Sequence, residues 1–163
     1  MSITYGEMHD YAISSYFVDF ENAKITLKLF WPYKEKAFWM KEDEPNIDSI
    51  IFFNVMGYGI ESGVHNNLMK KENYYGMHSN DLFDIFEYTL SEYLKEYGDS
   101  ILVDIGNRVP FRFKDRNEFM KKLNEYNLNI YVVNTSTGDL GLCGWILSEK
   151  MEIVFKSEWD IIE

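Results

Sequence analysis

Alternating apolar and polar residues predict a strand pair near the start of the chain. In residues 24–31, "KITLKLFW", every second side chain is apolar, as expected for a strand with one buried face. These apolar positions are Ile25, Leu27, Leu29 and Trp31. Residues 11–20 also have the composition of a strand, and the polar link "ENA" predicts a turn with Asn22 in the left-handed conformation.

Further strands are predicted in the middle and at the end of the chain. The nearly continuous apolar run 48–56, "DSIIFFNVM", is typical of a strand covered on both faces, so we place it at the centre of the sheet. Residues 128–133, 140–147 and 151–156 predict three more strands. Residues 57–79 show no sustained period, and long irregular connections are often binding surfaces.

Two segments have the period of a helix. Over about residues 80–97, apolar side chains recur at spacings of three and four, and Gly98 follows as a stop signal. These side chains are Phe83, Phe86, Leu90, Leu94 and Tyr97. The second helix is expected at about 115–126, because Asp115 and Glu118 have the spacing of a capping box and Asn127 can end it. Between the helices, 100–105 and 108–113 predict a hairpin whose second strand, with Pro110, is an edge.

The order of these segments predicts the fold class. Strands, helix, strands, helix and strands do not alternate as in a doubly wound sheet, which favours an α+β fold with two helices packed on a mainly antiparallel sheet. The chain has 163 residues without repeats, low-complexity tracts or a Pro- and Gly-rich linker. We therefore expect residues 1–163 to form a single domain.

Composition narrows the cellular setting. Hydrophobic residues make up 46% of the chain, yet none of their runs approaches the length of a membrane helix. The first residues lack a basic start followed by an apolar stretch, so a cytoplasmic protein is expected. Cys143 has no second cysteine to pair with, and we interpret it as a small buried apolar side chain.

Charge restricts the class of partner. The net charge of −11 produces a field that repels phosphate backbones, which argues against nucleic acid as a partner. Acidic residues dominate 81–104, whereas basic residues dominate 108–122. Both segments are also compatible with ordinary solvated faces of neighbouring helices.

No residue pattern specifies a reaction. His9 and Asp10 directly precede a strand, whereas metal-dependent phosphohydrolases place such a pair on a helix. A metal site from His9, His65, His78 and Cys143 would have none of the short paired spacings of zinc motifs. The sequence also lacks Gly-x-Ser-x-Gly, and "GYGIESG" is not a dinucleotide loop. We therefore predict no catalytic residue, no metal and no cofactor. A small enzyme or metal-binding protein would require His9, His65 and His78 to converge in a pocket.

Contact surfaces are easier to nominate. Large aromatic side chains in loops are typical of protein interfaces, and Tyr74, Tyr75 and the segment 38–40, "FWM", have this character. Exposed carboxylates of the first predicted helix would steer a basic partner, and the aromatic side chains would act as apolar anchors. The predicted partner-binding residues are Tyr74, Tyr75, Asp84, Glu87, Glu92 and Glu96.

The opening of the chain, over roughly residues 9–55, resembles small bacterial immunity-protein-type families, which neutralise polymorphic or contact-dependent toxins. The resemblance lies in "HDYAISSYFVDFENAKITLKL" followed by "IDSIIFFNV". It implies a cytoplasmic, non-catalytic α+β protein that occludes a toxin, and a basic nuclease toxin would suit the acidic charge. A homo-oligomeric scaffold is the other non-enzymatic alternative, with the oligomeric state left open.

Overall fold

The computed structural model describes residues 3–4, 11–31, 35–38, 40–61, 82–135, 143–156 and 158–159. These residues form nine strands and three helices. The strands are β1 (Ile3–Thr4), β2 (Ala12–Asp19), β3 (Lys24–Phe30), β4 (Asn46–Phe53), β5 (Gly57–Glu61), β6 (Leu82–Thr89), β7 (Asn129–Thr135), β8 (Cys143–Ser148) and β9 (Lys150–Lys156). The helices are α2 (Leu90–Tyr97), α3 (Ser100–Gly106) and α4 (Arg116–Asn124).

The strands form two antiparallel sheets that pack face to face. The larger sheet has the order β1-β6-β7-β8-β5 and the smaller sheet the order β2-β3-β4-β9. One core lies between them, because buried residues of the smaller sheet, such as Leu27 and Phe52, belong to the same cluster as Tyr131 and Ile146 of the larger sheet. The rings of Phe52 and Tyr131 meet edge to face at 5.3 Å. The α+β class with a mainly antiparallel arrangement is therefore confirmed, with the strands divided between two sheets.

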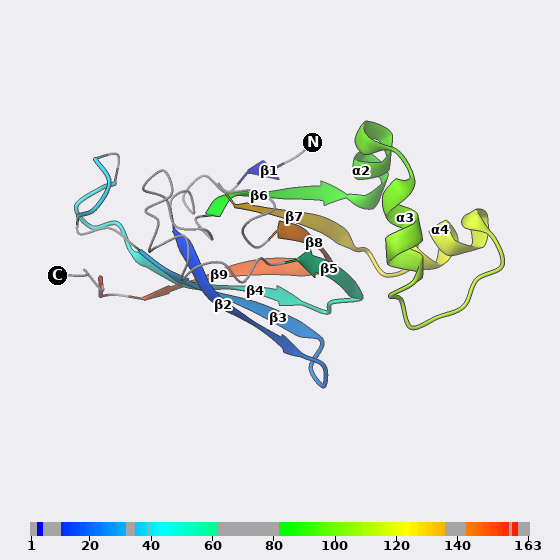
Figure 1. Cartoon of the computed structure of the whole chain (residues 1–163), viewed down its shortest axis with the longest axis horizontal. Helices are drawn as coiled ribbons and strands as arrows, with labels where there is room; N and C mark the ends of the chain where they lie inside the picture. Colours follow the sequence, from blue (N-terminus) through cyan, green and yellow to red (C-terminus); the bar gives the residue numbers. More distant parts are fainter. Residues whose placement is uncertain are drawn as a thin grey trace.

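The three helices cover the other face of the larger sheet at one end of the molecule (Figure 1). Alternation along the strands separates the two faces: Ile146 points into the inter-sheet core, whereas Trp145 and Leu147 belong to the core beneath the helices. That second core also contains Ile105 of α3 and Phe119 of α4. The larger sheet is thus the middle layer, buried on both sides over β7 and β8.

The chain passes between the two sheets at a shared corner. β4 continues into β5 through residues 54–56, and Glu149 alone separates β8 from β9. Because β4 pairs with β9 and β5 pairs with β8, one long hairpin bends from sheet to sheet. Asn54, with φ of 52°, forms the bend, and its side chain donates to the Glu149 carboxylate. This corner fixes how the sheets face each other.

The first predicted helix is only half helical. Residues 82–89 form β6, and the helix begins at Leu90. Ile85, Phe86 and Tyr88 fit a strand as well as a helix, and antiparallel pairing with β7 decides between them. Thr89 then caps α2: its side chain accepts from Glu92 N while the Glu92 carboxylate accepts from Thr89 N.

The predicted hairpin at 100–113 is also wrong. Residues 100–106 form α3, because Ile101, Leu102 and Ile105 have helical spacing and are buried in the core beneath the helices. Residues 108–113 are not a strand but turns and irregular structure leading to α4. The second predicted helix is confirmed, with the Asp115 side chain accepting from Glu118 N at 2.9 Å.

Of the remaining predicted strands and turns, some are confirmed and some are wrong. The apolar run expected at the centre of the sheet forms β4, which lies between β3 and β9. It is not covered on both faces, because Ile50 and Phe52 are buried whereas Ile51 and Phe53 on its other face are only half-buried. The three C-terminal strands are confirmed as β7, β8 and β9. The left-handed residue of the β2–β3 turn is Ala23, not Asn22, because Asn22 N instead donates to the Asp19 carboxylate. Residues 57–61, expected to be irregular, form β5.

Candidate functional site

Several residues nominated from the sequence lie outside the described part of the chain. These are His9, Asp10, Trp39, His65, Tyr74, Tyr75 and His78. Within the described residues, no group of three or more His, Cys, Asp and Glu side chains is arranged to hold a metal ion. Cys143 is half-buried at the start of β8. None of the helices in the described ranges is long and apolar enough to span a bilayer.

The four nominated acids do not share one helix face. Asp84 and Glu87 belong to β6, whereas Glu92 and Glu96 belong to α2. The half-buried Glu87 accepts from Asn129 Nδ2 at 3.1 Å and from the Tyr131 hydroxyl at 3.3 Å. Glu92 caps α2, so Glu87 and Glu92 both have structural contacts, and Glu96 is an exposed carboxylate at the helix end of the molecule.

The surroundings of the Tyr131 hydroxyl predict that the folded protein loses stability at alkaline pH. Burial, together with the negative charge of Glu87, raises the pKa of the Tyr131 hydroxyl from 10.0 to about 12. The unfolded chain therefore releases this proton at lower pH than the folded protein, and stability should fall as the pH rises from about 10 to about 12. Tyr131→Phe should cost about 1 kcal/mol at pH 8 but lessen the further loss at pH 11. Urea unfolding of both proteins at pH 8 and pH 11 measures the free energy of unfolding. If both proteins lose the same stability between these pH values, this role of Tyr131 is contradicted.

A projecting loop at the opposite end from the helices is held by two tryptophans. Trp31 Nε1 donates to the Glu35 carbonyl at 2.8 Å, and Trp159 Nε1 donates to the Glu44 carbonyl at 3.0 Å. The Trp31 and Trp159 rings meet edge to face at 6.0 Å, and Tyr11 contacts both rings. Both ends of the segment 35–45 are thereby fixed to one aromatic cluster.

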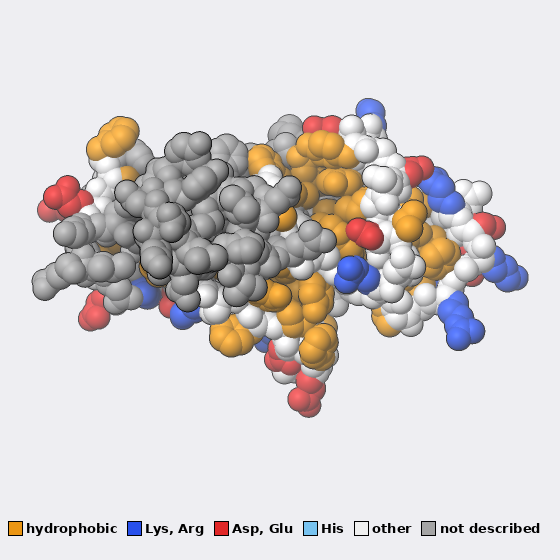
Figure 2. Space-filling view, in the orientation of Figure 1, with side chains coloured by type: hydrophobic (Ala, Val, Ile, Leu, Met, Phe, Trp, Pro, Cys, Tyr) orange, Lys and Arg blue, Asp and Glu red, His pale blue; other side chains and the backbone are white. Residues whose placement is uncertain are grey.

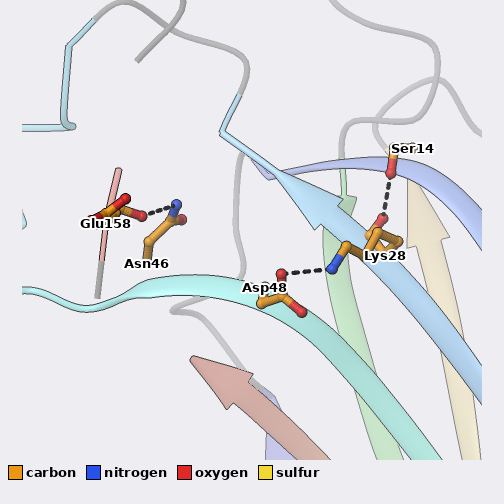
Figure 3. Close-up of polar contacts among 5 residues, drawn as sticks. All are labelled: Ser14, Lys28, Asn46, Asp48 and Glu158. Carbon is orange, nitrogen blue, oxygen red and sulfur yellow. Dashed lines mark hydrogen bonds and ion pairs between the residues drawn. The ribbon is translucent and has the colours of Figure 1, made fainter. Parts of the chain in front are cut away.

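Lys36 and the segment after β9 add to this bracing. The Lys36 ammonium donates to the Glu42 carbonyl at 3.1 Å and lies 4.9 Å from the centre of the Trp159 ring. Asn46 Nδ2 donates to the Glu158 carbonyl at 3.2 Å, while Lys28 and Asp48 form an ion pair nearby (Figure 3). The Lys36 ammonium thus adds two contacts that hold the loop against the aromatic cluster.

The braced loop displays an aromatic side chain among carboxylates. Phe38 is fully exposed, with a relative accessibility of 101%. We call this surface the acidic end and define it as the described residues of 35–45 together with Phe155, Glu158 and Trp159. Its carboxylates are Glu35, Glu42, Asp43, Glu44 and Glu158, against the lysines Lys36 and Lys41. In Figure 2, acidic and hydrophobic side chains mark this loop, whereas Lys and Arg gather over α4 at the other end.

A pocket of about 280 Å³ opens within the acidic end. It is lined by Tyr11, Met40, Glu44, Pro45, Ile47 and Phe155. Met40, Pro45, Ile47 and Phe155 supply apolar side chains, and Glu44 is the one charged residue among the described residues that line it. The Phe155 side chain is half exposed at 51%. The pocket thus combines apolar walls with one carboxylate.

A second candidate surface surrounds the β2–β3 turn. A groove of about 370 Å³ is lined by apolar side chains, including Val18, Phe20 and Met56, and by three charged residues. Phe17 and Phe20 are 62% and 83% exposed. Lys24 and Arg108 in this groove outnumber Asp19, so its local charge does not favour a basic partner. A third groove, between α3 and α4, is lined by the ion pair of Asp99 with Arg116.

Comparison of the chain with family models, curated proteins and solved structures finds no match. The geometry of the described residues is therefore the main evidence on the site. Sequence reasoning identified Phe38 as an aromatic contact residue but missed the role of Trp31 and Trp159. Their signal was present, because the indole N–H of a buried tryptophan usually finds an acceptor.

Proposed function

We propose that the protein is a non-catalytic, acidic binding module of the cytoplasm, of the immunity-protein type, which neutralises a basic toxin by covering its surface. The observation that carries the proposal is the fully exposed Phe38 on a loop that both tryptophans brace, surrounded by carboxylates. An isolated exposed apolar residue is ordinary, whereas one held in place within a charged rim has the composition of an interface anchor.

Electrostatics supports a basic partner. A protein of net charge −11 attracts cationic surfaces over several ångströms, and the described residues of the acidic end carry five carboxylates against two lysines. Toxins that act on nucleic acid need basic surfaces to hold phosphates. An acidic inhibitor is steered to that same surface and competes for it. A nuclease is therefore the class of toxin that suits this protein best.

Bracing of the loop supports tight binding. Ordering a loop on association reduces affinity, and here the loop ends are already fixed by indole hydrogen bonds and the Lys36 contacts. The side chain of Phe38 can therefore enter a partner with little loss of backbone entropy. This is the physical reason to prefer the acidic end over the nominated acids of β6 and α2.

Co-expression tests the proposal. The product of the neighbouring gene is expressed in a heterologous bacterium with and without this protein, and growth is measured. We expect growth arrest without the protein and normal growth with it, together with recovery of a stoichiometric complex of the two chains. If the neighbouring product is harmless, or is equally toxic in the presence of this protein, the immunity role is wrong.

Phe38→Ala should weaken that complex without changing stability. Loss of an aromatic anchor at an interface costs about 2 kcal/mol, or a roughly thirtyfold increase in Kd. Because Phe38 is fully exposed in the free protein, the melting temperature should not change. Titration calorimetry measures the Kd. The matched control is Phe20→Ala on the β2–β3 turn, which removes a similarly exposed ring. A loss of affinity in the control alone would place the partner on the other groove.

A further inference from the structure

The pocket in the acidic end has the lining expected for a long cationic side chain. Apolar walls from Ile47, Met40 and Phe155 suit a methylene stem, and the Glu44 carboxylate suits a positive head group. A volume of about 280 Å³ is small for an independent small-molecule site but ample for one side chain. These dimensions favour part of a partner protein over a free metabolite as the occupant.

Of the polar groups around the pocket, the Glu44 carboxylate is the charged one that can bind a ligand. The Tyr11 hydroxyl donates to Asn46 Oδ1 at 3.0 Å and accepts from Ile47 N at 3.1 Å, so its hydrogen bonds are satisfied internally. The Glu44 carbonyl accepts from Trp159 Nε1, which holds the residue in place. The Glu44 carboxylate, in contrast, has no hydrogen bond or ion pair to any residue within the described ranges.

The field of Glu44 reaches the pocket wall. Burial raises the pKa of the Tyr11 hydroxyl, the hydrogen bond from Ile47 N opposes this, and the negative charge of Glu44 raises the pKa further. A cation in the pocket would lie in the same field. The acidic end already holds one cation against an aromatic ring, since the Lys36 ammonium lies 4.9 Å from the Trp159 ring centre.

We propose that this pocket binds an arginine side chain of the basic partner, with the guanidinium on the Glu44 carboxylate and against the Phe155 ring. This assignment rests on the proposed function and names the chemical group of the partner that the acidic end recognises. Arginine is favoured over lysine because its planar head is more weakly hydrated, stacks on aromatic rings and pairs with a carboxylate through two hydrogen bonds. Phe38 then anchors the partner while the pocket fixes its register.

Amide NMR with a small probe tests the assignment without the partner. N-acetyl-arginine amide is titrated into the ¹⁵N-labelled protein, and N-acetyl-citrulline amide serves as a neutral probe of nearly the same shape. We expect saturable shifts at Tyr11, Glu44, Ile47 and Phe155, with affinity for the citrulline probe at least about fivefold weaker. Glu44→Gln, which keeps the carbonyl contact with Trp159, should weaken arginine binding by about the same factor.

Glu125→Gln is the matched control, because it removes an exposed carboxylate at the helix end and should leave arginine binding unchanged. Equal affinity for both probes, unchanged binding by Glu44→Gln, or shifts confined to other surfaces would overturn the assignment. Failure here combined with protection of cells by the protein leaves the immunity role intact and removes only the arginine pocket. Arginine binding without protection of cells would support the arginine pocket and remove the immunity role.

Discussion

Gly144→Ala is expected to prevent stable folding. Gly144 lies in β8 opposite Ile60 of β5 and has φ of +148°, a conformation that residues with a Cβ rarely adopt. A Cβ at this position would be 2.0 Å from the Gly59 carbonyl oxygen and 2.9 Å from Ile60 Cα. Both obstacles are backbone, so relief requires separation of β5 from β8. We expect a loss of at least about 4 kcal/mol, close to the whole stability of many domains.

Gly98→Ala provides the control for that substitution. Gly98 also has a positive φ, of 84°, but none of the described residues would lie within 4 Å of a Cβ added there. Strain alone should therefore cost about 1 kcal/mol. Soluble yield, near-ultraviolet circular dichroism and urea unfolding measure both variants. A folded Gly144→Ala protein of nearly normal stability would mean that β5 and β8 are not packed as described.

Charge reversal at the acidic end should produce the largest change in the rate of association. Replacing Glu42, Asp43 and Glu44 by lysine removes the attraction for a basic partner and should slow association with the neighbouring gene product by about tenfold or more. The rate should also lose most of its dependence on salt. Folding should be retained, because the loop is held through the carbonyls of Glu42 and Glu44, which every residue possesses.

A second triple variant separates local from global charge. Lysine at Glu96, Asp104 and Glu125 reverses the same number of exposed acids on and near the helices. If the acidic end is the docking surface, this control should slow association only slightly. Stopped-flow mixing at two ionic strengths measures both proteins. A slower rate for the helix variant than for the loop variant would favour the region of the acids first nominated on α2.

Sequence pattern predicted the regular elements best where one periodicity was possible. β3 was predicted because its alternation fits a strand alone, and β4 because its apolar run is too short for a typical helix. In 82–89, clustered Phe, Ile and Tyr satisfied both a helical and a strand pattern, and only pairing with β7 resolved it. The Thr89-x-x-Glu92 capping box is the local signal that the helix begins at Leu90 and that the residues before it are not helical.

The site was less accessible to sequence reasoning for a physical reason. Net charge and exposed aromatics are compositional, so an acidic binding protein could be suggested from the chain alone. The acidic end depends on contacts between distant segments: Glu44 and Trp159 are 115 residues apart, and Asn46 and Glu158 are 112 apart. No local pattern records such contacts. Glu87 and Glu92 were nominated as exposed contact acids, but their hydrogen bonds within the protein became visible only with β6 and α2 in place.

Hydrogen exchange of the complex with the neighbouring gene product tests the central claim most directly. Amide exchange is compared for the free protein and the purified complex, with peptide coverage of residues 12–30, 35–61, 90–124 and 143–159. Docking at the acidic end predicts slower exchange in 35–45 and 155–159, and little change in α2, α3 and α4. Protection of the β2–β3 turn or of the helices, with 35–45 unchanged, would contradict it.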